Sequence, residues 1–258
     1  MAQPKLLIAD GAGTLFDPGS TVPVYGFQEG FRHYIPKDCN IKFDFEPSFD
    51  LVMKYMGRGK LQHVQLLLQE RDIQKAFVSR FNRKPAEDDI KGIYECFKEQ
   101  LYPAAARTEE IHGVREAALR LRRAGIPIIM ITGYDRKMVD ETRKKLTWLD
   151  DVLICFFTNS DVKAGRPAPY LIHRAMEAAG IENPRYAVNV GDTKVDMESA
   201  DNACMPGIIV TSGSVNLAEA DSISLQLGRR HAIFPGLVSV IDSILDGTLP
   251  VKLRKLNE

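Results

Sequence analysis

Several features that would decide the class of a protein at once are scarce or missing in this sequence. Only four cysteines occur in 258 residues, and no two of them form a Cys-x-x-Cys pair, which argues against a disulfide framework and against a zinc site. No apolar run approaches the length of a membrane span, and no apolar stretch follows a basic start at the N-terminus. We therefore expect a cytoplasmic protein with reduced thiols and no membrane partner.

An excess of charge of one sign is missing too. Thirty-four Lys and Arg residues balance thirty-four Asp and Glu residues, so the formal net charge is zero. Nucleic-acid binders usually carry a basic excess that attracts the phosphate backbone, so nucleic acid is not an expected partner. A composition of 45% hydrophobic and 26% charged residues indicates one large globular domain, or a core domain with an insert. A small-molecule partner fits this composition better.

What the sequence does contain is a series of short apolar runs separated by longer amphipathic stretches. Each run is typical of a buried strand in a parallel sheet. The runs are Leu6–Ala9, Ile126–Ile131, Val152–Phe157, Ala187–Val190 and Ile208–Val210. Between Val114 and Ala124 the apolar residues keep helical spacing, and Gly125 follows where a helix should stop. The pattern predicts a doubly wound, Rossmann-like α/β sheet, whose ligands bind beyond the carboxyl ends of the strands.

The strand pattern disappears from about Val22 to Ala106. Amphipathic helices are expected there, for example at Leu61–Arg71 and Ala86–Leu101. The simplest arrangement is a helical domain inserted after the first strand of the sheet.

The borders of this insert divide the chain into a cap and a core. We expect residues 22–104 to form the helical cap domain, and residues 1–21 and 105–258 to form the core domain. Proline, glycine and small residues at both borders indicate two hinge strands. These residues are Pro18, Gly19 and Pro23 on one side, and Pro103 with Ala104 to Ala106 on the other.

Polar residues follow four of the predicted strands. They are Asp10 after the first strand, Thr132 and Gly133 after "IPIIMI", Lys163 and Arg166 in "DVKAGRPAP", and Asp192 and Asp196 in "VNVGDTKVDM". An open parallel sheet gathers its strand ends along one edge, so these groups are expected to share a crevice. Each alone is more often a turn residue or a helix cap, and the inference depends on their occurring together.

The chemistry of these groups is that of phosphoryl transfer. The carboxylates of Asp10 and Asp192 can hold Mg²⁺, which is usually bound by one or two carboxylates together with phosphate oxygens of the substrate. The Thr132 hydroxyl, the Gly133 amide and the Arg166 guanidinium can bind the remaining substrate oxygens. Asp10 can then attack phosphorus as a nucleophile.

The motifs "DGAGTLFD", "ITGY", "KAGRPAP" and "VGDTKVDM" resemble those of the haloacid dehalogenase superfamily of aspartate-nucleophile phosphotransferases, over the whole predicted core. The common first motif is DxD, whereas here Asp10 is followed two residues later by Ala12. This departs from the phosphatases and mutases and is similar to the phosphonatase branch. The resemblance implies that Asp10, Asp192 and the backbone carbonyl of Ala12 ligate Mg²⁺, with Asp196 in a supporting position.

The insert contains a second resemblance. Its stretch "YMGRGKLQHVQLLL" is similar to the phosphonatase cap motif that carries a Schiff-base lysine, which would be Lys60. In a continuous helix, Met56, Lys60, His63 and Val64 would share one face and present an amine and an imidazole to the core. A single lysine or histidine in a helix is more often solvated or structural, so this assignment depends on the agreement with the core motifs.

The alanine in the first motif has a chemical rationale. A phosphate ester leaves as an alkoxide that an aspartic acid can protonate, whereas a phosphonate needs an electron sink for the carbon that leaves phosphorus. In phosphonoacetaldehyde, Lys60 can convert the neighbouring aldehyde to an iminium, which accepts those electrons. The acid is then unnecessary, and Ala12 leaves room for the lysine.

The resulting hypothesis is hydrolysis of the P–C bond of phosphonoacetaldehyde to acetaldehyde and phosphate, with a Lys60 Schiff base and an Asp10 aspartyl phosphate. Lys60 must begin unprotonated, so its pKa should be lowered by desolvation or by nearby positive charge. His63 and Tyr134 are expected to relay protons, and Met56 to pack beside the lysine.

Two residues differ from the phosphonatase pattern: Gly11 stands where a bulky aromatic is usual, and Ser20 where some members have a cysteine. The alternatives are a Mg²⁺-dependent phosphatase of the same superfamily, a hydrolase of another carbonyl-bearing phosphonate, and a catalytically silent module that senses phosphorylated metabolites. The resemblance also suggests a homodimer that pairs through the cap.

Overall fold

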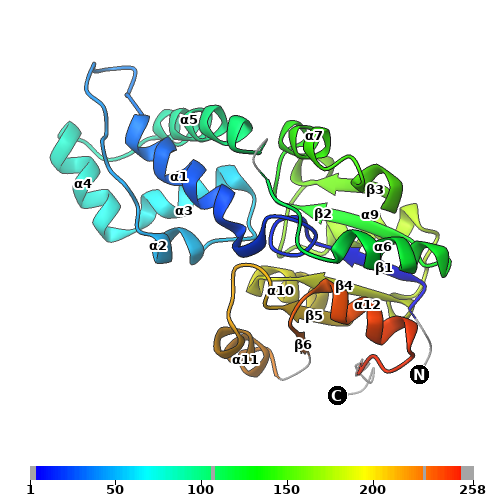
Figure 1. Ribbon diagram of the computed structural model, residues 1–258. Helices are drawn as coiled ribbons and strands as arrows, with labels where there is room; N and C mark the ends of the chain where they lie inside the picture. The colour runs from blue at the N-terminus through cyan, green and yellow to red at the C-terminus, as the bar shows by residue number, and fades with distance from the viewer. Residues whose placement is uncertain (1–3, 106–107, 229–230, 251–258) are drawn as a thin grey trace.

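The core of the protein is a six-stranded parallel sheet with helices on both faces (Figure 1). The computed structural model describes residues 4–105, 108–228 and 231–250. In spatial order β3-β2-β1-β4-β5-β6, the strands are Leu153–Thr158, Ile128–Thr132, Leu6–Ala9, Ala187–Gly191, Gly207–Val210 and Ala232–Phe234. The predicted doubly wound α/β fold with a helical insert after the first strand is confirmed.

Successive residues of β1 pack against opposite layers of helices. Leu7 and Ala9 belong to one hydrophobic cluster, Leu6 and Ile8 to another, as the alternation of side chains along a strand requires. Helices α6, α7, α8 and α12, which span Val114–Arg123, Arg136–Lys145, Leu149–Val152 and Leu237–Leu245, contribute to the first cluster. Helices α9 and α10, which span Tyr170–Ala178 and Lys194–Asn202, contribute to the second, and α11 spans Leu217–Gln226.

The strand order reverses between β1 and β4, which lie side by side. From β1 the chain continues to one side of the sheet through β2 and β3, and then returns to β4 on the other side. A crevice forms beyond the carboxyl ends of the strands at such a reversal. Asp10 directly follows β1, and Asp192 directly follows β4, so both carboxylates lie at this point.

Two strands differ from the sequence prediction. β3 was expected to be buried but is an edge strand of intermediate exposure, with Ile154 41% exposed. The guanidinium groups of Arg136 and Arg143 lie 5.1 and 5.2 Å from the ring centre of Phe156 and cover part of it. β6 was not predicted, because three residues are too few to show a period. The predicted helix that stops before Gly125 is confirmed as α6.

Within the described residues, five helices form the cap and lie together beside the core in Figure 1. They are α1 (Thr21–His33), α2 (Phe49–Met53), α3 (Lys60–Gln69), α4 (Arg71–Phe81) and α5 (Glu87–Ala105). The long helices α1 and α5 pack closely where Gly30 meets α5, since a Cβ at Gly30 would lie 2.9 Å from the Phe97 backbone. Phe27 and Phe97 stack beneath this contact with ring centres 4.4 Å apart.

The borders of the cap helices differ from the expectation. The segment predicted as one helix at Leu61–Arg71 ends at Gln69, because Glu70 is extended and Arg71 begins α4. The helix predicted at Ala86–Leu101 begins one residue later and continues to Ala105.

Some of the residues predicted to form two hinge strands at the borders are helical instead. Pro23 lies in the first turn of α1, where the missing N–H of proline costs no hydrogen bond, and Pro103 to Ala105 belong to the end of α5. Pro18–Ser20 form a 3₁₀ turn, and Ala106 lies outside the described residues. The division into domains at residues 21/22 and 104/105 stays a prediction.

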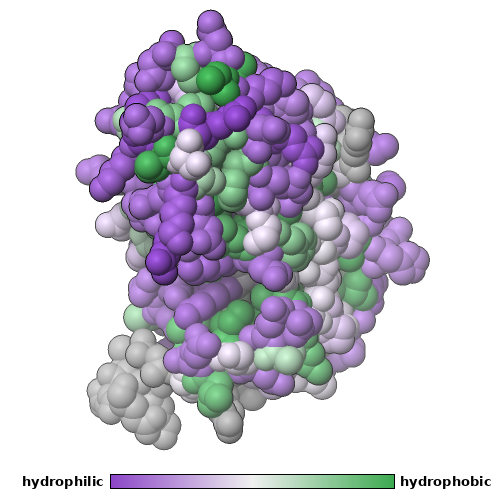
Figure 2. Space-filling model, turned by 90° about the vertical axis from the view of Figure 1, so that its left-hand side faces the viewer, coloured by the Kyte–Doolittle hydropathy of each residue, from purple (hydrophilic) through white to green (hydrophobic). Residues whose placement is uncertain are grey.

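Figure 2 shows the side of the molecule that lies at the left of Figure 1. Hydrophilic residues cover most of this face, and hydrophobic residues appear in separate places among them. Among the described residues, no helix has the length and the apolar character to cross a membrane.

Candidate active site

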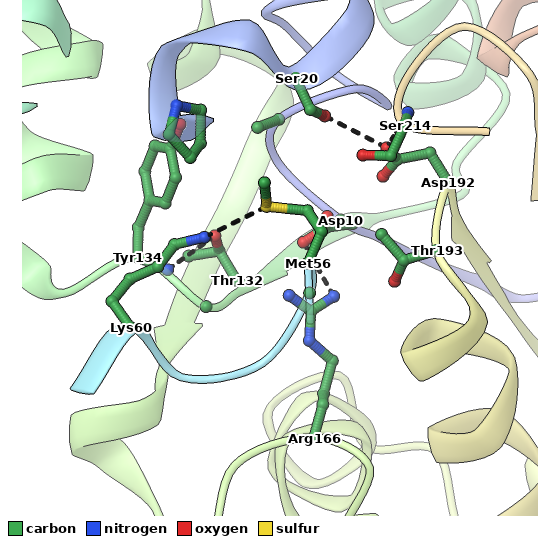
Figure 3. Close-up of a pocket in the computed structure, with 14 residues that line it drawn as sticks. Asp10, Ser20, Met56, Lys60, Thr132, Tyr134, Arg166, Asp192, Thr193 and Ser214 are labelled. Carbon is green, nitrogen blue, oxygen red and sulfur yellow. Dashed lines mark hydrogen bonds and ion pairs between the residues drawn. The ribbon is translucent and has the colours of Figure 1, made fainter. Parts of the chain in front are cut away.

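A cavity lies at the carboxyl ends of the strands, under the cap (Figure 3). The core lines it from the segments that follow the first five strands, and the cap covers it with Pro23 of α1, the turn before α3 and the first residue of α3. The lining residues are Asp10, Ala12, Ser20, Pro23, Met56, Gly57, Lys60, Thr132, Gly133, Tyr134, Arg166, Asp192, Thr193 and Ser214. Sequence segments far apart in the chain therefore meet here, as the strand-end argument predicted.

Arg166 joins two of the carboxylates. Its Nη1 lies 2.9 Å from Asp10 Oδ1 and also pairs with Asp196 Oδ1, and all three side chains are almost completely buried. Arg166 was expected to bind substrate oxygens, whereas in the structure Nη1 is engaged by the core's own carboxylates. The charge of the guanidinium therefore offsets part of the negative charge beside the candidate nucleophile.

Asp196 has a structural role as well. Its Oδ2 accepts hydrogen bonds from the backbone N–H and the hydroxyl of Thr193, at 3.0 and 2.5 Å. Thr193 in turn caps α10, so the two residues form a reciprocal capping box. This arrangement fixes Asp196 Oδ1 toward Arg166 and holds the segment after β4 in place.

Asp192 is held by one of its oxygens only. Oδ2 accepts hydrogen bonds from Ser20 Oγ at 3.1 Å and from the Ser214 backbone N–H at 2.6 Å. Gly13 and Gly213 allow the close approach, since a Cβ on Gly13 would lie 2.3 Å from this oxygen. Oδ1 is buried and has no hydrogen-bond partner among the described residues.

The three carboxylates form a group that could hold a metal ion. Asp10, Asp192 and Asp196 each offer an oxygen, and these atoms lie within 4.8 Å of one another. Burial raises the pKa of Asp10 to about 8, although Arg166 opposes this, and burial raises the pKa of Asp192 to about 6. Buried carboxylates with an unpartnered oxygen fit a hard cation, which prefers oxygen ligands.

Lys60 faces these carboxylates from the cap. It is the first residue of α3 and is 6% exposed, with Nζ 3.7 Å from Met56 Sδ and 5.6 Å from the ring centres of Phe27 and Tyr134. Burial lowers the pKa of Lys60 to about 8, although Asp10 opposes this. The positive end of the helix dipole at the start of α3 acts in the same direction as burial.

The prediction that a single helix carries Met56, Lys60 and His63 is wrong in part. The helix begins at Lys60, and Met56 lies in the preceding turn, where Gly57 has a φ of 86°. A Cβ at Gly57 would lie 2.5 Å from Thr193 Oγ1, so the turn sits directly on the core. Met56 nevertheless packs beside the lysine, as was expected.

His63 points into the cap rather than into the cavity. Its ring centre lies 4.0 Å from that of Phe27, and the side chain is completely buried. Burial, with Lys60 nearby, lowers the pKa of His63 well below its usual value, so the imidazole is neutral. The relay of protons by His63 stays a prediction, and the position of the His63 side chain does not favour it.

The loop after β2 brings three predicted residues to the cavity. Thr132 Oγ1 accepts a hydrogen bond from the Tyr134 backbone N–H at 3.1 Å. A Cβ on Gly133 would lie 2.9 Å from the carbonyl oxygen of Arg58, so this loop also touches the turn before α3. Tyr134 is buried, burial raises the pKa of its phenol, and the hydroxyl has no partner among residues that the structure describes.

Some site residues were not found from the sequence, and one that was considered does not belong to it. Lys163 is exposed and does not line the cavity. Ser214 follows β5, and the strand-end argument applied to that strand would have found it. Ser20 was noted only as a departure from the phosphonatase pattern, and its bond to Asp192 has no signal in the sequence.

The other departure, Gly11, is explained by packing. A Cβ at Gly11 would lie 2.9 Å from the Phe16 ring, so this ring occupies the space that a larger side chain at position 11 would need. Phe16 in turn lies 6.3 Å from the ring of Tyr134.

An aspartate at the switch point of a doubly wound sheet, beside a buried arginine and under a helical cap, defines a class of hydrolase. The chain belongs to the haloacid dehalogenase-like hydrolase family, which it matches over residues 5–203. It is 33% identical over 223 residues to phosphonoacetaldehyde hydrolase of Bacillus cereus, and the alignment covers 84% of this chain and 80% of that protein.

A second relative aligns over more of the chain. Phosphonoacetaldehyde hydrolase of Paraburkholderia phytofirmans is 29% identical over 261 residues, with 95% of this chain and 93% of that protein covered. A crystal structure of a phosphonoacetaldehyde hydrolase-like protein from Oleispira antarctica has the same fold, with a TM-score of 0.82 at 22% identity and coverage of 98% and 96% of the two chains. These comparisons confirm the predicted superfamily and the assignment as a hydrolase.

Proposed function

We propose that this hydrolase cleaves the P–C bond of phosphonoacetaldehyde and releases acetaldehyde and phosphate. The observation that carries the proposal is the buried amine of Lys60 in the same cavity as Asp10, with the methyl group of Ala12 where a phosphatase would have its acid. The names of the two relatives, at 33% and 29% identity, support the same substrate.

Lys60 begins the reaction as a neutral amine. With a pKa of about 8, roughly one molecule in ten carries the free amine at pH 7, against about one in three thousand for an ordinary lysine. The amine adds to the aldehyde carbon, and uptake of one proton with loss of water leaves a protonated imine. Met56 Sδ lies beside Lys60 Nζ and is only a weak hydrogen-bond acceptor. It therefore does not stabilise the charged amine relative to the neutral amine.

Asp10 then displaces carbon from phosphorus. One of its carboxylate oxygens attacks phosphorus, the P–C bond breaks, and the electron pair moves to the iminium nitrogen to give an enamine. The enamine takes a proton on carbon and is hydrolysed to acetaldehyde, which frees Lys60, and water cleaves the aspartyl phosphate to release phosphate. Arg166 keeps positive charge at Asp10 while the carboxylate changes its bonding. Tyr134 lines the same cavity, and its hydroxyl, which stays protonated because burial raises its pKa, would donate a proton there.

The site fits Mg²⁺ as cofactor. Asp10 and Asp192 would hold the ion, with the backbone carbonyl of Ala12, which also lines the cavity. When bound, the ion offsets the negative charge of the phosphonate oxygens during attack by a carboxylate. Ser20 and the Ser214 N–H hold Asp192 Oδ2, which leaves Oδ1 free for this role.

The experiment is the release of both products from phosphonoacetaldehyde with Mg²⁺. Wild type should release acetaldehyde and phosphate in equal amounts. Lys60→Arg, which keeps the charge but cannot form an imine, should abolish both. Lys91→Arg is the matched control, because Lys91 is an exposed lysine of the cap. Borohydride added with substrate should inactivate wild type and leave an ethyl group on Lys60.

The outcomes separate the alternatives. The proposal would be refuted in favour of a phosphatase by two results together. These are that no acetaldehyde is released from phosphonoacetaldehyde, and that an aryl phosphate ester is hydrolysed at the same rate by wild type and by Lys60→Arg. Cleavage of other carbonyl-bearing phosphonates but not of phosphonoacetaldehyde would keep the mechanism and change the substrate. Binding of phosphate without any release would indicate a sensing module.

We further propose that the enzyme acts in the cytoplasm as a homodimer that pairs through the cap. The cap exposes Phe49 and Leu61, which are 50% and 44% accessible. Sedimentation equilibrium gives the test, since Phe49→Glu should shift a cap-mediated dimer toward monomer and leave any other dimer unchanged.

A further inference from the structure

The last cap helix, α5, contacts the Asp135 carboxylate in the loop after β2. Tyr102 donates a hydrogen bond to Asp135 Oδ2 at 3.1 Å, and Tyr94 donates to the same oxygen at 3.4 Å. Both tyrosines belong to α5 and lie eight residues apart in that helix. Lys137 Nζ lies 4.1 Å from the ring centre of Tyr102 and extends the contact. We refer to these four residues as the α5 contact.

Asp135 is also part of the core's own structure. Its Oδ1 accepts a hydrogen bond from the Met138 backbone N–H at 2.9 Å and thereby caps α7. The two residues before it, Gly133 and Tyr134, line the cavity. One carboxylate therefore connects the cap helix, a core helix and the loop that carries a residue of the candidate active site.

The same short loop meets the cap a second time. Gly133 lies against the carbonyl oxygen of Arg58, in the turn that immediately precedes Lys60. Residues 133–135 thus touch the cap at the turn before α3 and at α5, which are far apart in sequence. A change in the α5 contact would alter how this turn rests on the core.

We propose that Tyr94, Tyr102 and Asp135 are positioning residues that hold the cap closed on the core and keep Lys60 inside the cavity. None of the three lines the cavity, so they act through the placement of Lys60 and Tyr134 rather than on the substrate. The inference goes beyond the proposed function and rests on it only for the kinetic readout described below.

The hydrogen bonds of the α5 contact should persist over a wide pH range. Burial and the neighbouring Asp135 raise the pKa of both tyrosines, so their hydroxyls stay protonated and donate throughout the pH range of the folded protein. Hydrogen bonds to a charged acceptor are among the stronger ones in proteins. The rings themselves pack whether or not the hydroxyls are present, which makes removal of the hydroxyl a selective change.

The test is the double variant Tyr94→Phe/Tyr102→Phe. It keeps both rings and leaves Asp135 as the cap of α7, so the fold should persist. Tyr25→Phe is the matched control, because it removes a hydroxyl from an exposed tyrosine of the cap. Trinitrobenzenesulfonate labels lysine amines, and mass spectrometry gives the labelling rate of Lys60 relative to that of exposed Lys91 in the same sample.

Lys60 should be labelled at least about tenfold faster in the double variant than in wild type, because two hydrogen bonds to a charged group are lost and one strong bond of this kind corresponds to about tenfold. Tyr25→Phe should match wild type. Labelling of Lys60 at the wild-type rate in the double variant would overturn the inference. If the double variant does not fold, Tyr102→Phe alone should give a smaller increase in the labelling rate of Lys60. An unchanged labelling rate in this single variant would also overturn the inference.

Kinetics with phosphonoacetaldehyde distinguish positioning from loss of folded enzyme. A cap that closes less often lowers kcat and raises KM together, whereas a smaller folded fraction lowers the apparent kcat and leaves KM unchanged. An unchanged KM would refute positioning. The labelling of Lys60 does not depend on turnover. If wild type releases no acetaldehyde, the proposed function is refuted, but the labelling rates still test the role of the α5 contact.

Discussion

Replacing Lys60 by methionine should stabilise the folded protein at neutral pH while it abolishes P–C cleavage. Burial holds the pKa of Lys60 at about 8 in the folded protein, against 10.5 in the unfolded chain. The folded state therefore binds this proton more weakly, and the cost to stability is complete below about pH 8 and disappears above about pH 10.5. The difference corresponds to about 3 kcal/mol at pH 7, as an order of magnitude.

The gain from Lys60→Met should accordingly depend on pH. It should fall by about half between pH 7 and pH 9.5, because Lys60 of the folded protein loses its proton in this range while the unfolded chain still keeps most of its own. Urea unfolding followed by circular dichroism, which reports the cap helices, measures this difference. Lys91→Met, at an exposed position of the cap, is the control and should change stability little at either pH.

Two results would refute the reasoning. No stabilisation by Lys60→Met at pH 7 would mean that the amine is solvated and has an ordinary pKa. A gain that stays the same from pH 7 to pH 9.5 would mean that methionine packs better for reasons unrelated to charge. In either case the lowered pKa would not be the source of the neutral amine that imine formation needs.

Further predictions concern the carboxylates and the metal. Ala12→Asp should lower acetaldehyde release at pH 7 at least tenfold, since another carboxylate in the cavity raises the pKa of Lys60; a shift of the pH–rate profile to higher pH checks the cause. Arg166→Met should destabilise the protein by about 3–5 kcal/mol in urea unfolding, because Asp10 and Asp196 lose a buried partner. Chelation with EDTA should abolish phosphate release, and added Mg²⁺ should restore it; full activity in EDTA would contradict the proposed cofactor.

The positions of the core site residues follow from the topology, and the sequence therefore predicts them well. Asp10, Thr132 and Asp192 come directly after apolar runs, and any parallel sheet brings the ends of neighbouring strands to one edge. Arg166 was found by the same argument, but its partners were not. Its pairing with Asp10 and Asp196 depends on the path of the segment after β3, which no local pattern specifies.

The cap shows where the sequence pattern is insufficient. Three residues of helix separate Lys60 from His63, which leaves their side chains about 60° apart around the axis. That angle is enough for Lys60 to face the cavity while His63 packs against Phe27 inside the cap. Apolar periodicity identifies the buried side of a helix but does not tell a cavity from a hydrophobic core, because both exclude water.

The bond between Ser20 and Asp192 has a consequence for the exchange of caps between related enzymes. Ser20 directly precedes α1, the first cap helix, and its hydroxyl holds one oxygen of a candidate metal ligand in the core. Asp17, Gly19 and Ser20 all have positive φ, so this short linker has a defined path that few sequences can follow. A chimaera that takes the linker from another protein would disturb the carboxylate as well as the cap. A chimaera should therefore be joined after Ser20, so that the donor contributes the cap helices and the recipient keeps the linker that contacts its candidate metal ligand.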